Sequence, residues 1–148
     1  MNSRMIYVHI PFCESKCFYC DFVSGKYSEQ TKQQYIDELK KEIVSNKNKN
    51  QTISSIFIGG GTPSSIKKEY IKQIIECVRQ NFDVLSDAEI TIEANPCSIN
   101  FEKLVEYRNC GINRISIGVQ SLDNSLLKTI GRLHNRQQVI DAILNLGP

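Results

Sequence analysis

The 148-residue sequence lacks the features that mark several protein classes. No apolar run approaches the 18 residues that a membrane-spanning helix needs, so none is expected. Residues 1–5 lead directly into a short strand-like run, without the apolar core of a secretion signal. Basic residues are scattered, the net charge is only +2, and the densest basic run, residues 45–51, is expected to be a solvated loop. These features favour a protein that neither spans a membrane nor binds nucleic acid.

The sequence also has no low-complexity tract and no linker that would divide it into domains. Hydrophobic residues make up 41% of the chain and charged residues 23%, which are ordinary values for a globular protein. A chain of 148 residues is long enough to bury a sizeable core. We therefore expect one domain over residues 1–148.

Strand-like and helical patterns alternate along the chain. The expected strands cover residues 5–10, 53–58, 89–94 and 114–119, and the expected helices cover residues 31–45, 67–82, 101–110, 123–130 and 135–146. Ser64 or Ser65 is the expected N-cap of the second helix and Asp123 that of the fourth, while Gly111 and Gly147 are expected to end the third and fifth helices. Four successive βα units predict an α/β fold with parallel strands joined by right-handed crossovers.

Three of the six cysteines lie close together, as Cys13-x3-Cys17-x2-Cys20. A structural zinc ion or a closed iron–sulfur cluster usually takes four protein ligands, whereas three thiolates on a four-iron cluster leave one iron open for a substrate or cofactor. The spacing favours such a cluster. A zinc site with His9 as fourth ligand and three unligated thiols are the alternatives. Without a secretion signal, reduced thiols in a cytoplasmic protein are expected rather than disulfides.

The remaining three cysteines have a simpler interpretation. Cys77 and Cys110 fall at apolar positions of helical patterns, and Cys97 follows Asn95 and Pro96 in a loop. We expect each to be a small, buried or half-buried hydrophobic residue.

Unusual residues occupy the ends of the four expected strands, where a βα barrel places its active site. Residues 59–61 are three glycines before Thr62; they either bring backbone close to a polar ligand or form only a tight turn. Glu93 ends an apolar strand and is either a ligand for a cationic group or solvated. Gln120 offers hydrogen bonds to a ribose. Arg132 either pairs with a carboxylate or is a surface charge, and His134 is expected to cap or pack locally.

Together these motifs resemble the radical S-adenosylmethionine (SAM) superfamily. Residues 7–22, YVHIPFCESKCFYCDF, are similar to the oxygen-independent coproporphyrinogen III oxidase-like family, which includes porphyrinogen oxidases and haem chaperones. The resemblance covers the whole chain but only the first part of such a protein. It implies a partial (β/α) barrel of about four parallel βα units, which is the N-terminal part of a radical SAM core domain whose later strands and C-terminal domain are absent.

The resemblance also implies roles for individual residues. Cys13, Cys17 and Cys20 would bind a [4Fe–4S] cluster, whose fourth iron would be chelated by SAM. The residues implied to contact the cluster or SAM are Tyr7, Tyr19, Gly60, Gly61, Thr62, Glu93, Gln120 and Arg132. The implied partners are haem or a porphyrinogen, a flavodoxin- or ferredoxin-like electron donor and a haem-acceptor protein.

Two departures from the family pattern bear on function. The oxidases carry a further cysteine just after the triplet, where this chain has residues 21–23, DFV, and they carry an N-terminal extension. Both differences favour the haem-chaperone branch. The alternatives are an oxygen-independent coproporphyrinogen III oxidase and a non-catalytic metal-binding remnant. The missing strands are expected to leave an uncovered apolar face and two open sheet edges, through which the chain would associate with itself.

Overall fold

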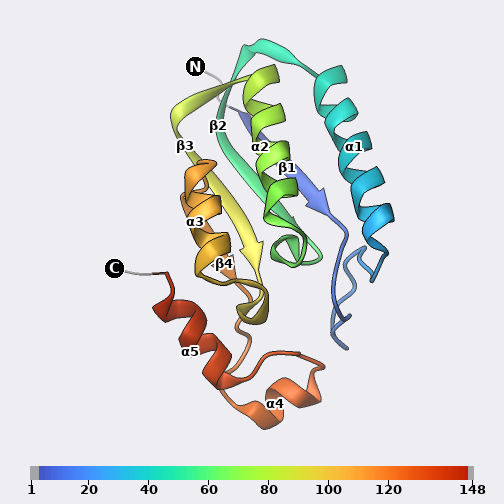
Figure 1. The fold of residues 1–148 in the computed structure, drawn as a ribbon, viewed down its shortest axis with the longest axis vertical. Coiled ribbons are helices and arrows are strands. Elements are labelled where there is room, and N and C mark those ends of the chain that lie inside the picture. Colours follow the sequence, from blue (N-terminus) through green and yellow to red (C-terminus); the bar gives the residue numbers. More distant parts are fainter. Residues whose placement is uncertain (1–3, 147–148) are drawn as a thin grey trace.

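A computed structural model describes residues 4–146 and contains one four-stranded sheet (Figure 1). The strands are β1 (Arg4–Ile10), β2 (Asn48–Gly60), β3 (Phe82–Ala94) and β4 (Arg114–Ile117), which lie in chain order. Every neighbouring pair is parallel. The predicted α/β class and parallel sheet are confirmed.

Helices make the connections between the strands. The helices are α1 (Glu29–Ser45), α2 (Lys68–Asn81), α3 (Phe101–Asn109), α4 (Asn124–Thr129) and α5 (Arg136–Leu144). Two short 3₁₀ turns, η1 (Pro63–Ser65) and η2 (Pro96–Ser98), follow β2 and β3. Helices α1, α2 and α3 lie on the same side of the sheet, whereas α4 and α5 follow β4 beyond its end (Figure 1). This is the arrangement of a partial βα barrel.

The core lies between the sheet and helices α1 to α3. Ile58 and Ile92 are fully buried on the helix side of the sheet, and Ile71 and Ile74 of α2 pack in the same cluster. Because side chains alternate along a strand, the other face carries the intervening residues. They include one register row across the sheet, formed by Tyr7, Phe57, Thr91 and Arg114. The expectation of an uncovered apolar face was partly right: no helix of residues 4–146 covers this face, but it combines the aromatic rings of Tyr7 and Phe57 with polar side chains.

Some element boundaries differ from the sequence-based expectations. The segment 45–51 is not only a solvated loop, because β2 begins at Asn48 and pairs there with Phe82 of β3. β3 likewise begins seven residues before the expected strand, at Phe82, whereas β4 ends at Ile117. Charged and polar residues enter these strands because backbone pairing with a neighbouring strand outweighs their weak strand propensity. The expected helix end at Gly147 lies outside the described residues.

The predicted helix caps were partly right. Asp123 caps α4, accepting from the backbone of Ser125 at 2.7 Å, and Gly111 follows α3 with φ of +100°. Neither Ser64 nor Ser65 caps α2, because both lie in η1 and the helix begins after Lys67. Ser64 is fully buried and forms a hydrogen bond with the Ser98 hydroxyl.

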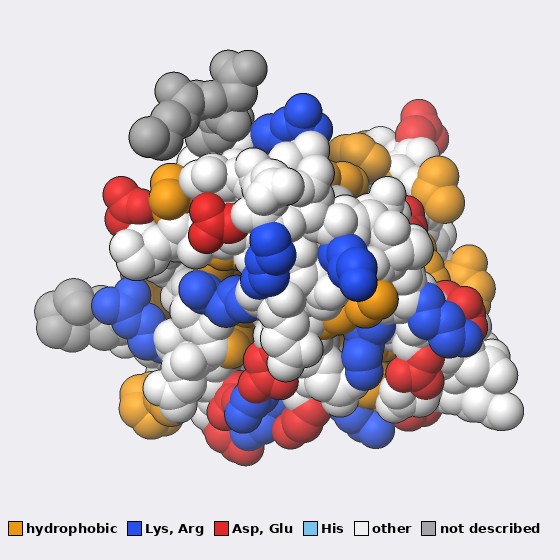
Figure 2. Space-filling view, turned by 90° about the horizontal axis from the view of Figure 1, so that it is seen from above, with side chains coloured by type: hydrophobic (Ala, Val, Ile, Leu, Met, Phe, Trp, Pro, Cys, Tyr) orange, Lys and Arg blue, Asp and Glu red, His pale blue; other side chains and the backbone are white. Residues whose placement is uncertain are grey.

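Opposite charges are mixed on the surface. The end of the molecule seen in Figure 2 shows Lys and Arg interspersed with Asp and Glu. Ion pairs Lys68–Glu102 and Lys72–Glu106 join α2 to α3. Within residues 4–146, no helix has the length and apolar character required to span a membrane.

Candidate functional site

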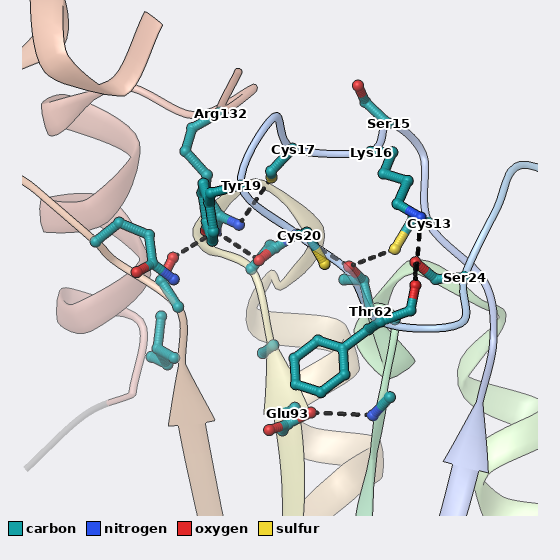
Figure 3. Close-up of a pocket in the computed structure, with 18 of the residues that line it drawn as sticks. Cys13, Ser15, Lys16, Cys17, Tyr19, Cys20, Ser24, Thr62, Glu93 and Arg132 are labelled. Carbon is teal, nitrogen blue, oxygen red and sulfur yellow. Dashed lines mark hydrogen bonds between the residues drawn. The ribbon is translucent and has the colours of Figure 1, made fainter. Parts of the chain in front are cut away.

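A cavity of about 370 Å³ opens at the carboxyl ends of the strands (Figure 3). Ten of the eleven residues expected from the sequence line it: Cys13, Cys17, Tyr19, Cys20, Gly60, Gly61, Thr62, Glu93, Gln120 and Arg132. Parallel strands bring their carboxyl ends to one edge, so residues far apart in sequence meet there. The eleventh, Tyr7, lines a different pocket beside β1 and α1.

The cysteine loop, residues 13–25, is closed at its base and fastened at its tip. At the base, Cys13 N–H donates to the Gly25 carbonyl at 2.9 Å, and Gly25 N–H donates to the Pro11 carbonyl at 3.0 Å. At the tip, Phe18 N–H donates to the Ile130 carbonyl at 3.2 Å. The loop therefore reaches from the end of β1 to the segment after α4, across the strand ends.

The three motif thiols are free, half buried and directed to one cavity. Cys13 Sγ lies 3.5 Å from Thr62 Oγ1, and Cys17 Sγ accepts from the Arg132 guanidinium at 3.5 Å. Among residues 4–146, no three His, Cys, Asp or Glu side chains converge tightly enough for a single metal ion. A structural zinc ion usually takes four protein ligands, whereas a four-iron cluster with one open iron takes three thiolates at separate corners. Three thiols at one cavity therefore fit the cluster better than zinc.

His9, the proposed fourth zinc ligand, has both ring nitrogens engaged. One lies 3.0 Å from the Tyr7 hydroxyl and the other 3.1 Å from the Val23 carbonyl. A ring nitrogen that binds a carbonyl must carry a proton, so it has no lone pair for a metal. In this structure His9 supports the end of the cysteine loop.

The glycine turn after β2 forms a wall of bare backbone. Gly60 has φ of +117°, and a Cβ there would lie 2.8 Å from the His9 ring. A Cβ on Gly61 would lie 2.7 Å from the Phe12 carbonyl oxygen and 2.9 Å from Cys13 Sγ. The turn itself therefore requires glycine, and the absence of side chains also lets a ligand approach the backbone closely.

Glu93 and Gln120 both line the cavity. The Glu93 carboxylate accepts the backbone N–H of Gly60 at 3.1 Å, which ties the end of β3 to the glycine turn. Gln120 has φ of +64°, the one positive φ among the described non-glycine residues. Such strained backbone concentrates at functional sites, where the surrounding structure holds it. Both side chains point to the cavity that the sequence assigned to them.

Arg132 connects three parts of the site. Its guanidinium donates to Asn95 Oδ1 at 2.6 Å, to the Gly118 carbonyl and to Cys17 Sγ. Its Nε is buried and has no hydrogen-bond partner within residues 4–146. An unsatisfied buried N–H at the wall of a cavity is a donor available to a bound ligand. Burial raises the pKa of the neighbouring Tyr19, an effect that the positive charge of Arg132 opposes.

Sequence reasoning missed Asn95, which lies between Arg132 and Thr62. Its amide nitrogen donates to Thr62 Oγ1 at 3.1 Å. The available signal was its position, since Asn95 is a polar residue directly after a buried strand. Lys16 and Ser24 also line the cavity from the cysteine loop, without a pattern that distinguishes them from surface residues.

The other cysteines follow their expected pattern with one exception. Cys77 is buried and Cys110 is half buried, and burial raises the pKa of each thiol. Cys97 is exposed, so its predicted burial was wrong. It lies in η2, which turns its side chain outward next to the buried Pro96. His134 is buried and packs locally, as expected, with its Nε2 2.9 Å from the Val119 carbonyl.

Comparisons with known proteins identify the family of this chain. A family model described as the radical SAM superfamily matches residues 7–147. The heme chaperone HemW of Buchnera aphidicola subsp. Schizaphis graminum is 43% identical over 141 residues, which cover 93% of this chain and 38% of that protein. HemW of Escherichia coli (strain K12) is 39% identical over 136 residues, covering 90% of this chain and 36% of that protein.

A solved structure shows the same arrangement of elements. Coproporphyrinogen III oxidase (HemN) from Escherichia coli, a radical SAM enzyme, superposes with a TM-score of 0.89 and 32% sequence identity. The match covers 97% of this chain and 34% of HemN. The chain thus spans less than two fifths of the length of these relatives.

Proposed function

This chain belongs to the radical SAM superfamily, and from that premise we propose that it binds a [4Fe–4S] cluster and SAM as part of a haem chaperone. The observation that carries the proposal is the meeting of three free thiols, a glycine turn, Glu93, Gln120 and Arg132 at one cavity. The proposed role is to pass haem to an acceptor protein in the cytoplasm. Similarity to the two HemW proteins supports the chaperone assignment.

Each part of the cavity has a proposed task. Cys13, Cys17 and Cys20 hold the cluster and leave one iron for the amino and carboxylate groups of SAM. The backbone at residues 60–61 and the Thr62 hydroxyl hold the methionyl part, and Glu93 takes its cationic group. Gln120 faces the ribose, Arg132 offers its unpaired Nε–H to a carboxylate, and Tyr19 lies against the adenine. Tyr7 is outside the cavity wall, so its contact with the cofactor stays a prediction.

The protein supplies binding, orientation and protection from water. When bound, a reduced cluster supplies one electron to the sulfonium of SAM. Thr62 and Arg132 would place hydrogen bonds at the thiols of Cys13 and Cys17, and contacts of this kind around the sulfurs would tune the reduction potential of a bound cluster. A flavodoxin- or ferredoxin-like protein is the proposed electron donor.

An oxygen-independent coproporphyrinogen III oxidase is the second candidate. The close superposition with HemN favours it. Residues 21–23 lack the extra cysteine that the oxidases carry at this point, which favours the chaperone. An anaerobic assay for protoporphyrinogen separates the two, because only the oxidase forms it from coproporphyrinogen. Transfer of haem to an apo-haemoprotein, followed by its absorbance, is expected only of the chaperone.

The cofactor proposal is tested by anaerobic cluster reconstitution. We expect about four iron and four sulfide per chain and an EPR signal of the reduced cluster that changes when SAM is added. Cys17→Ser should lose the signal, whereas Cys77→Ser, which alters a buried thiol between α1 and α2, should retain it. Zinc without labile sulfide would show the metal-binding remnant instead. A cluster signal that SAM does not change would contradict the open iron.

A further inference from the structure

We propose that Asn95 is a positioning residue that acts through Thr62 and Arg132 to set the hydrogen bonds at Cys13 and Cys17. The inference rests on the proposed function, because these thiols are the ones proposed to bind the cluster. Asn95 touches neither sulfur itself. It lies at the end of β3, directly between the two residues that do.

The backbone of Asn95 is held firmly in place. Its N–H lies 3.2 Å from the hydroxyl oxygens of both Ser64 and Ser98. The Lys103 ammonium donates to the Ser64 carbonyl and, at 3.0 Å, to the Ser98 carbonyl. Lys103 is largely withdrawn from solvent, and this burial lowers its pKa. These hydrogen bonds join the two 3₁₀ turns, η1 and η2, next to Asn95. The backbone from which the Asn95 side chain extends is therefore held in one position.

The orientation of the Asn95 amide follows from the chemistry of its neighbours. Arg132 lies 2.6 Å from one end of the amide, and a guanidinium has donors only. The amide oxygen must therefore face Arg132. The amide nitrogen then faces Thr62 Oγ1, 3.1 Å away, and donates to it. The amide thus supplies an acceptor on one side and a donor on the other.

The first arm of this arrangement directs the Thr62 hydroxyl. A hydroxyl has one proton and two lone pairs, and Asn95 donates into a lone pair. The single proton is therefore free to point toward Cys13 Sγ, 3.5 Å from Thr62 Oγ1. A thiolate has no proton to give, so the hydroxyl must be the donor in the ligated state.

The second arm fixes the plane of the Arg132 guanidinium. One of its terminal nitrogens is held by Asn95 and by the Gly118 carbonyl. Because the group is planar, this also fixes the other terminal nitrogen, which reaches Cys17 Sγ at 3.5 Å. One amide therefore couples two thiols of the cysteine loop to the ends of β3 and β4. Figure 3 shows the two contacts at the thiols, Thr62 with Cys13 and Arg132 with Cys17.

Donors at the sulfurs stabilise the reduced cluster, which carries the greater negative charge. Loss of Asn95 should therefore make the reduction potential more negative. It should also weaken SAM binding by about 10-fold, since groups that orient ligating residues commonly have effects of this size. A residue needed only for folding would change neither quantity in the loaded protein.

The test compares the reconstituted chain with Asn95→Ala and Asn95→Asp. EPR-monitored redox titration gives the potential, and the change of the EPR signal with SAM concentration gives the SAM affinity. Asn95→Ala removes both arms, so both quantities should change. Asn95→Asp keeps the acceptor for Arg132, but its second oxygen turns the Thr62 proton away from Cys13. The reduction potential of Asn95→Asp should therefore be lower than that of the wild type. In a Thr62→Val background there is no hydroxyl proton to redirect, so Asn95→Asp should lower the potential by less, and what remains is the effect of the added charge.

Asn113→Ala is the matched control. Asn113 Oδ1 accepts from the Ile90 backbone at 2.8 Å just before β4 begins, at the end of that strand away from the cavity, so the change should lower the melting temperature and leave the EPR signal unchanged. If Asn95→Ala fails to fold, Asn95→Asp carries the test. If the wild type holds the cluster and the Asn95 variants have the same reduction potential and SAM affinity as the wild type, the inference about Asn95 is wrong while the proposed function stands. A wild-type chain that binds no cluster overturns the proposed function, and the inference with it.

Discussion

At the residue scale, one wall of the cavity forms where the glycine turn packs directly against the cysteine loop, with no glycine side chain between them. The glycine turn lies so close to the cysteine loop that Gly61 leaves no room for a Cβ beside Cys13. Gly60 adopts a φ that other residues rarely adopt. The sequence showed that these positions are glycine, and the structure shows which atoms require it.

Gly60→Ala should lower both stability and cofactor binding. The new methyl group meets the His9 ring and forces strained backbone, at a cost of about 1–3 kcal/mol. Gly111→Ala is the control, because Gly111 also has positive φ but faces only the flexible end of Arg79. Thermal unfolding should show a lower melting temperature for both variants. Isothermal titration of the reconstituted protein with SAM should show a weaker affinity for Gly60→Ala only. Unchanged SAM binding in Gly60→Ala would contradict the assignment of the turn.

His134 should make the stability depend on pH. Burial lowers its pKa in the folded chain, and the charge of Arg132 acts in the same direction. The unfolded chain, with a histidine pKa of about 6.5, then binds more protons than the folded one. The stabilisation is therefore complete above that pH and is lost as the pH falls through the lower folded value.

Urea unfolding at pH 7.5, 6.5 and 5.5 checks this dependence. His134→Gln keeps a donor for the Val119 carbonyl but has no titrating group, so its stability should vary less over this range. Equal pH dependence in the two proteins would show that His134 is not the source.

At the scale of elements, the cysteine loop and the segment after α4 form a bridge over the strand ends. Phe18 binds the Ile130 carbonyl through its backbone, and its ring lies where a Cβ on Gly131 would contact it at 3.2 Å. The next residue, Arg132, reaches Cys17. Helix α4 therefore contributes to the site by holding the segment that carries Arg132.

Asp123→Ala should weaken SAM binding through this bridge. The Asp123 carboxylate caps α4 by accepting from the backbone of Ser125 and Leu126, and its loss frays the short helix before Arg132. Ser28→Ala is the control, because Ser28 caps α1 at a distance from Arg132 and should cost only about 1 kcal/mol of stability. SAM titration measures the affinity of both variants for SAM, and thermal unfolding measures their stability. If the two variants bind SAM equally well, α4 has no part in placing Arg132.

At the scale of the whole molecule, helices cover one face of the sheet and both outer strands have a free edge. Within residues 4–146, the order β1-β2-β3-β4 leaves β1 and β4 each with one neighbouring strand. Unpaired N–H and C=O groups on such edges bind other strands. Self-association of the chain stays a prediction, and the edges are where it should occur.

Met5→Lys should reduce self-association. Met5 lies on β1 and is 64% exposed, and a lysine on an edge strand opposes pairing with another chain. Gln80→Lys places the same charge on α2, which packs against both α1 and α3, and should have no effect. Light scattering across a range of concentrations measures the change. A chain that stays monomeric at all concentrations would contradict the prediction.

Much of the fold followed from the sequence alone. Alternating hydrophobic periods predicted the parallel α/β order, and the chemistry of Asp123 and Gly111 marked the start of one helix and the end of another. The starts of β2 and β3 escaped detection, because polar residues near Asn48 and Asp83 pair through backbone atoms that carry no sequence pattern. Ser64 resembled a helix cap because the local sequence does not show its hydrogen-bond partner, the Ser98 hydroxyl, which lies 34 residues away.

The sequence by itself determined which chemical groups the site contains, because the cysteine spacing and the residues at the strand ends are local patterns. Only the tertiary structure decided how those groups contact one another. Asn95 joins Arg132 to Thr62 because the ends of β2, β3 and β4 meet at one edge, and Tyr7 falls outside the cavity because its strand turns it toward another pocket. Contacts of this kind depend on the packing of segments distant in sequence, which no local spacing encodes.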